Sequence, residues 1–184
     1  FYSTGGSYRR LGEILGVQAS DRLVSVSDYT GQPEMQGGLV KTLDFKIYLG
    51  LLSETYNDDH RRDLERTGAV AFDMVVVNLY PFAETIARPD ATPEQARANI
   101  DIGGPCMIRA AAKNYIRVAP VVDPDDYAGI VRELEAGQGT LSLATRFRLA
   151  RKAFAHTAQY DAAIAGYLEE REDREVAGCY REIR

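Results

Sequence analysis

Hydrophobic residues recur along the chain with two periods, one typical of β-strands and one typical of α-helices. Runs of strand length, either alternating or continuously apolar, occupy residues 1–3, 22–27, 72–80 and 117–122,. Helical spacing or helix-start signals follow these runs. Strands that alternate with helices in this way pack as βα units, so we predict an α/β fold with a mainly parallel sheet.

Six segments carry helical patterns, and one of them is unusually long. We predict helices over residues 8–15, 58–67, 92–99, 106–113, 123–135 and 145–168,. The run 72–80 is apolar almost throughout, which is typical of a strand buried on both faces. Residues 28–39 are predicted to form a loop, 40–52 stay undecided, and 169–184 form a charged, irregular tail. The last helix has an apolar stripe made of Phe147, Ala150, Phe154, Thr157, Tyr160 and Ile164,.

Composition narrows the class of protein. The 184 residues are 45% hydrophobic and 27% charged, as in ordinary globular proteins, which argues against a disordered chain or a disulfide scaffold,. The net charge of −5 argues against a nucleic-acid-binding protein, which usually has a basic surface,. A single small anion needs only a local positive site, so the net charge allows one.

Neither a membrane nor a metal is expected as a partner. The apolar run at residues 74–77 is far too short to span a bilayer, and no leader-type segment is visible,. Cys106 and Cys179 are isolated and have no metal-ligand spacing with His60 or His156,. We therefore expect a reduced, cytoplasmic protein. The chain starts at Phe1 inside a strand-like segment, so we also expect further residues upstream.

Two glycine-rich turns join predicted strands to predicted helices. The turn at residues 4–7 can present backbone N–H groups to a phosphate, although an ordinary βα turn explains it equally well. The turn at residues 101–105 begins with a carboxylate, which suits a catalytic group better than a phosphate site. A plain helix cap by Asp101 is the more common outcome of such a sequence,.

Other candidates have ordinary alternatives. Lys41 follows a glycine-rich loop and Tyr80 ends a strand, but a solvated lysine and a core-edge tyrosine are common. Lys113 lies at the far end of the helix after Asp101, which is about 13 Å long at 1.5 Å per residue, so spacing does not bring the two together. A nucleophilic role for Cys106 is disfavoured because no histidine stands near it in sequence.

Taken together, eight ordered segments resemble one family, the IMP cyclohydrolase domain of the bifunctional purine-biosynthesis protein PurH. The resemblance covers residues 1–168, which we take as one domain, with 169–184 as the tail. The segments are Ser-Thr-Gly-Gly-Ser (3–7), Val-Ser-Asp-Tyr-Thr-Gly (26–31), Pro-Glu-Met (33–35), Val-Lys-Thr-Leu (40–43), Asp-Met-Val-Val-Val-Asn-Leu-Tyr-Pro-Phe (73–82), Asn-Ile-Asp-Ile-Gly-Gly-Pro (99–105), Arg-Ala-Ala-Ala-Lys-Asn (109–114) and Leu-Ala-Thr-Arg-Phe (143–147).

The resemblance implies a three-layer α/β fold like that of methylglyoxal synthase, with helices on both faces of the sheet. It also implies an enzyme that closes the purine ring of 5-formamidoimidazole-4-carboxamide ribotide (FAICAR). The carboxamide nitrogen attacks the formyl carbon and water is lost, which gives inosine monophosphate (IMP). No metal or cofactor is implied.

The resemblance assigns roles to thirteen residues. The turn of Thr4, Gly5, Gly6 and Ser7 cradles the 5′-phosphate, and the strand end at Val77 and Asn78 lines the nucleotide. A loop with Lys41 and Thr42 covers the base and phosphate side. The second turn, with Asp101, Ile102 and Gly103, faces the closing ring together with the proton-relay residues Lys113 and Tyr80. Which of Asp101 and Lys113 is the base stays open.

Several positions depart from the family pattern, so other functions stay open. Leu39 replaces an arginine, Asp44 and Tyr48 replace histidines, and a first strand with a Ser-x-Ser-x-Lys phosphate motif is absent. We expect a strand–helix unit of roughly 25 residues to be missing upstream, and nothing resembles the transformylase domain. A non-catalytic purine-nucleotide-binding or regulatory protein is the main alternative. A methylglyoxal-synthase-type lyase is disfavoured because the segment 78–82 matches PurH. The sequence does not fix the oligomeric state, for which a homodimer is the expectation.

Overall fold

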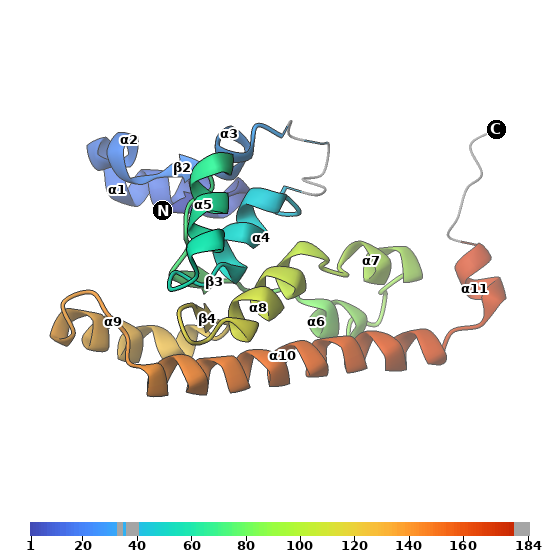
Figure 1. The fold of residues 1–184 in the computed structure, drawn as a ribbon. Helices are drawn as coiled ribbons and strands as arrows, with labels where there is room; N and C mark the ends of the chain where they lie inside the picture. Colours follow the sequence, from blue (N-terminus) through green and yellow to red (C-terminus); the bar gives the residue numbers. More distant parts are fainter. Residues whose placement is uncertain (33–34, 36–40, 179–184) are drawn as a thin grey trace. The chain divides into compact units, whose positions relative to one another are not determined.

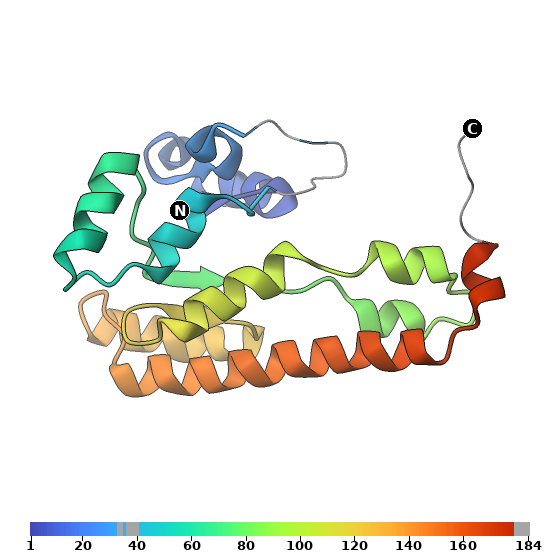
Figure 2. The same cartoon turned by 45° about the vertical axis from the view of Figure 1, so that its right-hand side comes forward.

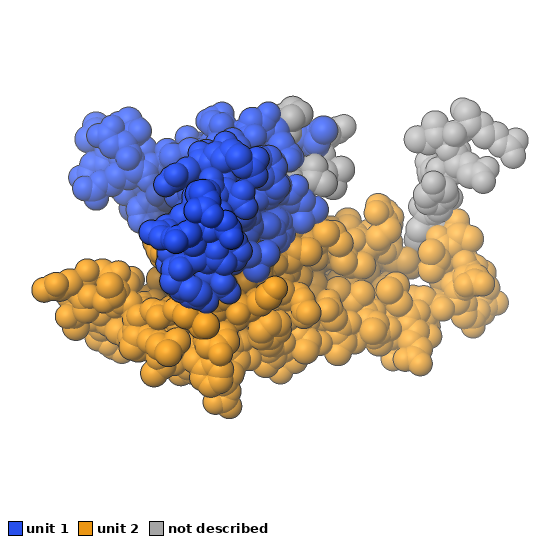
Figure 3. Space-filling model, in the orientation of Figure 1, with its two compact units in different colours: residues 1–72 blue, residues 73–184 orange. Residues whose placement is uncertain are grey.

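The computed structural model describes residues 1–32, 35 and 41–178, and the chain divides into two compact units (Figures 1 and 3). Unit 1 comprises residues 1–72 and unit 2 comprises residues 73–184. Each unit contains one pair of parallel strands among helices, and each is described by itself below.

Unit 1 is built on a short parallel pair. Strand β1 (Tyr2–Ser3) pairs with β2 (Val24–Ser25), with Tyr2 opposite Val24. The connection runs through helix α1 (Gly5–Leu15), the 3₁₀ turn η1 (Gly16–Gln18) and α2 (Ala19–Arg22). Parallel strands need such a crossover, and the predicted order of a strand followed by a helix is confirmed. The helix begins at Gly5 and not at the predicted Tyr8, so most of the predicted turn at residues 4–7 is its first turn.

The second predicted strand is shorter than expected because a helix interrupts it. Helix α3 (Val26–Thr30) begins directly after β2 and also replaces the first part of the predicted loop. The Thr30 hydroxyl donates to the carbonyl of Val26, 2.9 Å away, and Gly31 ends the helix in the left-handed conformation,. The loop positions Pro33, Glu34 and Leu39 lie outside the described residues.

Helices α4 (Phe45–Leu52) and α5 (Asp58–Thr67) complete unit 1. The undecided segment is therefore partly helical, and the predicted charged helix over 58–67 is confirmed. Gly50 of α4 accepts a hydrogen bond from the amide of Phe72 at 3.0 Å. A Cβ at Gly50 would lie 2.2 Å from the carbonyl oxygen of Val70, so this close approach of two backbones requires glycine,.

Unit 1 contains a cluster of three half-buried aromatic rings. The rings of Tyr2, Tyr29 and Phe72 lie edge to face, with centroids 4.8–6.0 Å apart,. The Tyr29 hydroxyl accepts a hydrogen bond from the amide of Val70 at 2.8 Å. Burial raises the pKa of Tyr29, so the hydroxyl stays protonated near neutral pH,. These contacts hold Phe72, the last residue of unit 1, against Tyr2 of strand β1.

Unit 2 contains the second parallel pair and the longest helix. Strand β3 (Met74–Val76) pairs with β4 (Ala119–Val121), and α6 (Phe82–Ile86), α7 (Pro93–Ala98) and α8 (Gly103–Lys113) connect them. The turn η3 (Pro124–Asp126), α9 (Tyr127–Ala136), α10 (Leu143–Glu169) and α11 (Asp173–Ala177) follow. Figures 1 and 2 show α10 running beside α6 and α8.

Small residues set the packing of α10. Its buried side chains are Leu149, Ala150, Ala153 and Thr157, and the two alanines pack with Ile108 and Ala112 of α8. Because alanines let the two helices approach closely, the larger rings are excluded. Phe147 and Phe154 are 47% and 41% exposed, so the predicted apolar stripe is wrong at these two positions.

The two strands of unit 2 differ in burial. Strand β4 is fully buried, whereas Val76 of β3 is 53% exposed, so the prediction of a strand buried on both faces is wrong for β3. β3 also spans less of the predicted run 72–80. The parallel pairing is confirmed, although helices dominate and the described strands form two separate pairs rather than one continuous sheet.

Local helix signals are confirmed in unit 2. The helix predicted over 92–99 is present as α7, where the Thr92 and Gln95 side chains form a capping box, and Gly137 follows α9, which lies in the predicted range 123–135 except for its last residue,. The charged tail contains one unpredicted element, α11, which has a capping box between Glu172 and Glu175. No helix among the described residues combines the length and the apolar character needed to cross a membrane.

Candidate functional site

The predicted phosphate turn lies in unit 1 at the start of α1. Thr4 is extended and Gly5 has φ +53°, a conformation that glycine adopts without strain,. The first intrahelical donor is the amide of Tyr8, which bonds to Thr4 at 3.1 Å. The preceding N–H groups of Gly5, Gly6 and Ser7 therefore have no intrahelical acceptor, and the first turn has no acidic residue,. This geometry suits an anion.

Lys41 and Thr42 lie in the turn before α4, and both side chains are half-buried. Asp44 is the N-cap of α4. Its Oδ1 accepts the amide of Lys46 at 2.8 Å, and its Oδ2 accepts Nε2 of Gln32 at 2.6 Å. Since both carboxylate oxygens are engaged and the residue is 8% exposed, Asp44 serves to build the helix start,. Leu39 lies outside the described residues.

The other predicted residues lie in unit 2. The amide of Val77 donates to the carbonyl of Val121 at 3.0 Å, which extends the ladder beyond β3. The exposed Asn78 donates through Nδ2 to Oη of Tyr127 at 3.4 Å. Tyr80 is 54% exposed. The segment after the carboxyl end of β3 thus presents an amide and a phenol.

Asp101 lies one residue before Ile102, the N-cap of α8, and this helix begins at Gly103 and not at the predicted Cys106. Oδ1 of Asp101 accepts the amide of Gly104 at 2.8 Å, and Pro105, which follows, has no N–H that needs a partner,. A Cβ at Gly104 would lie 2.7 Å from both Asp101 Oδ2 and Leu79 Cδ2. The carboxylate is therefore seated directly on the glycine, beside the exposed Ile102.

Tyr160 of α10 holds the same turn from the other side. Its hydroxyl accepts the amide of Asp101 at 2.8 Å and donates to the carbonyl of Asn99 at 2.9 Å. The sequence analysis missed this contact because it placed Tyr160 only in an apolar stripe. The available signal was the phenol itself, since a tyrosine hydroxyl in a buried stripe needs a hydrogen-bond partner.

Lys113 does not join Asp101. It is exposed at the last position of α8, whose 11 residues span about 15 Å at 1.5 Å per residue,. Among the described residues Lys113 forms no ion pair. The structure thus brings Asp101, Ile102, Gly103 and Tyr160 together and leaves Lys113 at the opposite end of the helix.

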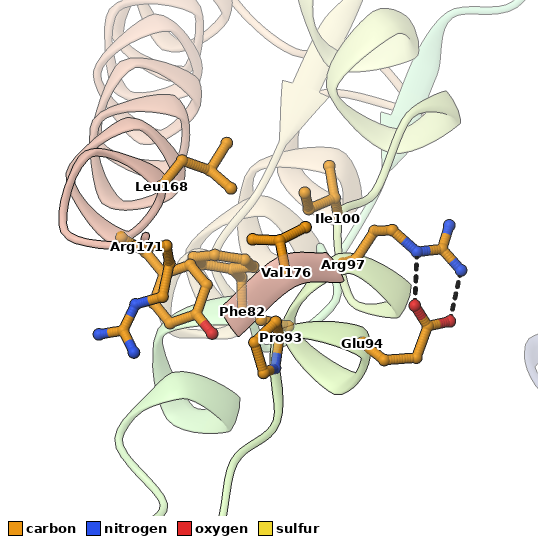
Figure 4. Close-up of a pocket in the computed structure, with 10 residues that line it drawn as sticks. Phe82, Pro93, Glu94, Arg97, Ile100, Leu168, Arg171 and Val176 are labelled. Carbon is orange, nitrogen blue, oxygen red and sulfur yellow. Dashed lines mark hydrogen bonds and ion pairs between the residues drawn. The ribbon is translucent and has the colours of Figure 1, made fainter. Parts of the chain in front are cut away.

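A pocket of about 470 Å³ lies elsewhere in unit 2, among α6, α7, α11 and the end of α10 (Figure 4). Figure 4 shows the Arg97 and Arg171 guanidinium groups turned away from its interior, and Arg97 pairs with Glu94 at 2.5 and 2.8 Å. None of the predicted site residues lines it. Within the described part of the chain, no cluster of three or more His, Cys, Asp or Glu side chains is arranged to hold a metal ion.

Comparisons with known proteins show which proteins this chain is similar to. A family model described as "AICARFT/IMPCHase bienzyme" matches residues 111–183. The chain is 52% identical over 167 residues to the bifunctional purine biosynthesis protein PurH of Acidithiobacillus ferrooxidans, covering 90% of this chain and 31% of that protein. It is 50% identical over 176 residues to PurH of Neisseria meningitidis, covering 96% and 32%. The chain thus spans about a third of the length of these curated relatives. The crystal structure of ForH matches with a TM-score of 0.73 and 35% identity, covering 89% of this chain and 82% of that one.

Proposed function

We propose that this chain, which belongs to the AICARFT/IMPCHase bienzyme family of PurH, is an IMP cyclohydrolase that closes the purine ring of FAICAR. In this reaction the carboxamide nitrogen of the substrate forms a bond to the carbon of its own formamido group. The formyl oxygen leaves as water with one proton from the carboxamide nitrogen and one proton from the formamido nitrogen, and IMP is the product. Both reacting groups belong to one molecule, so no co-reactant is needed.

The chemistry sets three requirements for the protein. The nitrogen and the formyl carbon must be held in contact, which supplies much of the rate. The formyl oxygen gains negative charge as the ring closes and needs N–H donors. A group must also take protons from the nitrogen and deliver them to the departing oxygen.

The observation that carries the proposal is the arrangement around Asp101. A half-buried carboxylate lies at the N-terminus of α8, next to the amides of Ile102 and Gly103. These amides precede the first intrahelical donor of α8, Cys106, so they are available to an oxyanion,. Asp101 then exchanges protons with the amide nitrogen, while the two amides stabilise the oxygen.

The remaining residues take supporting roles in this proposal. Within unit 1, the turn at residues 4–7 offers backbone N–H groups that suit a phosphate, and Lys41 and Thr42 offer a cation and a hydroxyl,. Val77 and Asn78 line the nucleotide. Tyr80 serves the proton relay. Because Lys113 lies at the other end of α8, we assign the proton exchange at the ring to Asp101.

The test is conversion of FAICAR to IMP, measured on the purified protein together with any residues that precede Phe1 naturally. We expect turnover well above the uncatalysed rate. Asp101→Asn keeps the size of the side chain but not its basicity, and we expect it to lower kcat by about 10²–10⁴-fold. Affinity for IMP should change little. A wild-type rate equal to the background rate would refute the proposal.

A non-catalytic purine-nucleotide-binding protein is the second candidate, and Asp44 is the observation that favours it. This position of a family histidine holds a carboxylate whose two oxygens are both engaged within unit 1. The two candidates differ in one measurement. Saturable IMP binding without formation of IMP from FAICAR supports the second and excludes the first.

A further inference from the structure

The hydroxyl of Tyr160 connects two distant parts of unit 2. The tyrosine lies on α10, 59 residues after Asp101, and its Oη makes one hydrogen bond to each end of the turn that precedes α8. As acceptor it takes the amide of Asp101 at 2.8 Å, and as donor it reaches the carbonyl of Asn99 at 2.9 Å. The Tyr160 hydroxyl thus acts as both acceptor and donor toward the turn that carries the Asp101 carboxylate.

The ring of Tyr160 is itself fixed by packing. It lies edge to face with Phe82, with centroids 6.2 Å apart, and Phe82 is 1% exposed. On its other side Phe82 contacts Tyr167 in the same manner at 5.8 Å. A side chain held by a buried partner keeps a defined rotamer, so the position of its hydroxyl is also defined.

The protonation state of the phenol suits this double role. Burial raises the pKa of Tyr160 above its ordinary value near 10, so at neutral pH the hydroxyl keeps its proton and can still donate to Asn99,. A phenolate would accept from Asp101 but would repel the Asn99 carbonyl. The turn is therefore held from both ends at the pH at which the protein works.

We propose that Tyr160 is a positioning residue for the Asp101 carboxylate, fixing it through the backbone of residues 99–101 without touching the substrate. This inference rests on the proposed cyclohydrolase function. Gly104 fixes the carboxylate from one side, through the hydrogen bond of its amide to Oδ1, and Tyr160 fixes the main chain that carries it. Together the two contacts leave the carboxylate little freedom to move away from the closing ring.

Tyr160→Phe tests the role because it removes the hydroxyl and leaves the ring on Phe82. We expect kcat for FAICAR to fall by about 10–100-fold, since a shift near 1 Å in a catalytic group has that effect, while KM changes less than about threefold. Tyr167→Phe is the matched control, because it deletes a hydroxyl on the same helix next to the same Phe82 ring. It should keep the wild-type kcat. All variants are compared at a temperature at which each is folded.

A second readout does not depend on turnover. The amide of Asp101 loses its acceptor in Tyr160→Phe, so its hydrogen exchange should speed up by about tenfold or more, and Tyr167→Phe should leave it unchanged. A wild-type protein without activity refutes the proposed function, and the exchange of the Asp101 amide still decides whether Tyr160 holds the turn. The positioning role is overturned if Tyr160→Phe leaves the exchange unchanged, keeps the wild-type kcat while Asp101→Asn loses it, or raises KM alone.

Discussion

Gly104 is the position at which a single methyl group would disturb the candidate site. An added Cβ would meet Asp101 Oδ2 and Leu79 Cδ2, both at 2.7 Å, so one of these side chains has to move. Both are the ends of side chains, which can give way, and the first of them belongs to the proposed catalytic carboxylate. Glycine at position 104 thus matters more because it leaves room for the Asp101 carboxylate than because of its own backbone conformation.

Gly104→Ala is therefore predicted to lower both stability and activity. Overpacking of a buried site costs about 1–3 kcal/mol of unfolding free energy, and the displaced carboxylate should lower kcat for FAICAR. Gly129→Ala is the control, because a Cβ at that helical position of α9 meets open space. It should raise stability by about 0.5–1 kcal/mol. Urea unfolding followed by tyrosine fluorescence measures both, since the chain has no tryptophan. Equal stability of the two variants would contradict the packing argument.

At the scale of residues, local chemistry was predictable and distant contacts were not. Asp101 was expected to cap a helix because an acid before Gly-Gly-Pro has that tendency wherever it occurs. Its contact with Tyr160 depends on two segments 59 residues apart, which only the fold brings together. The separation of Lys113 from Asp101 was also predictable, because the rise per residue of the helix between them sets that distance.

At the scale of elements, the start of α4 rests on one buried carboxylate. Asp44 joins the first turn of α4 to Gln32 through two hydrogen bonds of 2.8 and 2.6 Å. Restoring a histidine there to match the family would remove both acceptor oxygens. The segment before α4 therefore needs aspartate at position 44 to keep both hydrogen bonds.

Asp44→Ala should reduce the free energy of unfolding by about 1–2 kcal/mol, from a lost N-cap and a lost hydrogen bond to a charged group. Asp44→His should be destabilised in the same direction. Asp59→Ala removes an acid from α5 whose side chain is 81% exposed, so it should change stability by less than about 0.5 kcal/mol,. Unfolding in urea measures the three variants. If Asp44→His matches the wild type, the cap is not what fixes aspartate at this position.

Helices with complete local signals were predictable, whereas short strands were not. Thr92, Pro93 and Gln95 form the capping box of α7 that their spacing indicates. The alternating run 22–27 gave way to α3 after only two strand residues, because Gly31 provides a helix end that alternation does not show. The stripe of α10 was misplaced for another reason. Its alanines pack against Ile108 and Ala112 of α8, and a hydrophobicity pattern cannot anticipate that small residues displace Phe147 and Phe154.

At the scale of the whole molecule, carboxylates that form ion pairs in the folded protein should make the free energy of unfolding depend on pH. A hydrogen bond from Lys152 lowers the pKa of Asp123. Burial opposes ionisation of Asp126, but hydrogen bonds from Lys152 and Arg148 outweigh it, and the pKa of Asp126 is lowered as well. A group whose pKa is lower in the folded state stabilises the fold above its unfolded pKa, and this stabilisation is lost as the pH falls through the folded pKa.

The free energy of unfolding should therefore be nearly constant from neutral pH down to about pH 5 and fall below about pH 4. Asp126→Asn should be less stable than the wild type at neutral pH, and the difference should shrink in acid. Asp90→Asn, in an exposed turn, should follow the wild-type curve throughout. Urea titrations across this pH range measure the slopes. A constant difference between Asp126→Asn and the wild type at all pH values would contradict the linkage.

The account as a whole depends on one reaction, and the direct measurement is the initial rate of IMP formation from FAICAR by the wild type and by Asp101→Asn. Both proteins are first shown to bind IMP with similar affinity, so that a difference in rate reports on chemistry. The account predicts rapid ring closure by the wild type and a loss of about 10²–10⁴-fold in the variant. Ring closure at the same rate in both proteins, or at the uncatalysed rate in the wild type, would contradict it.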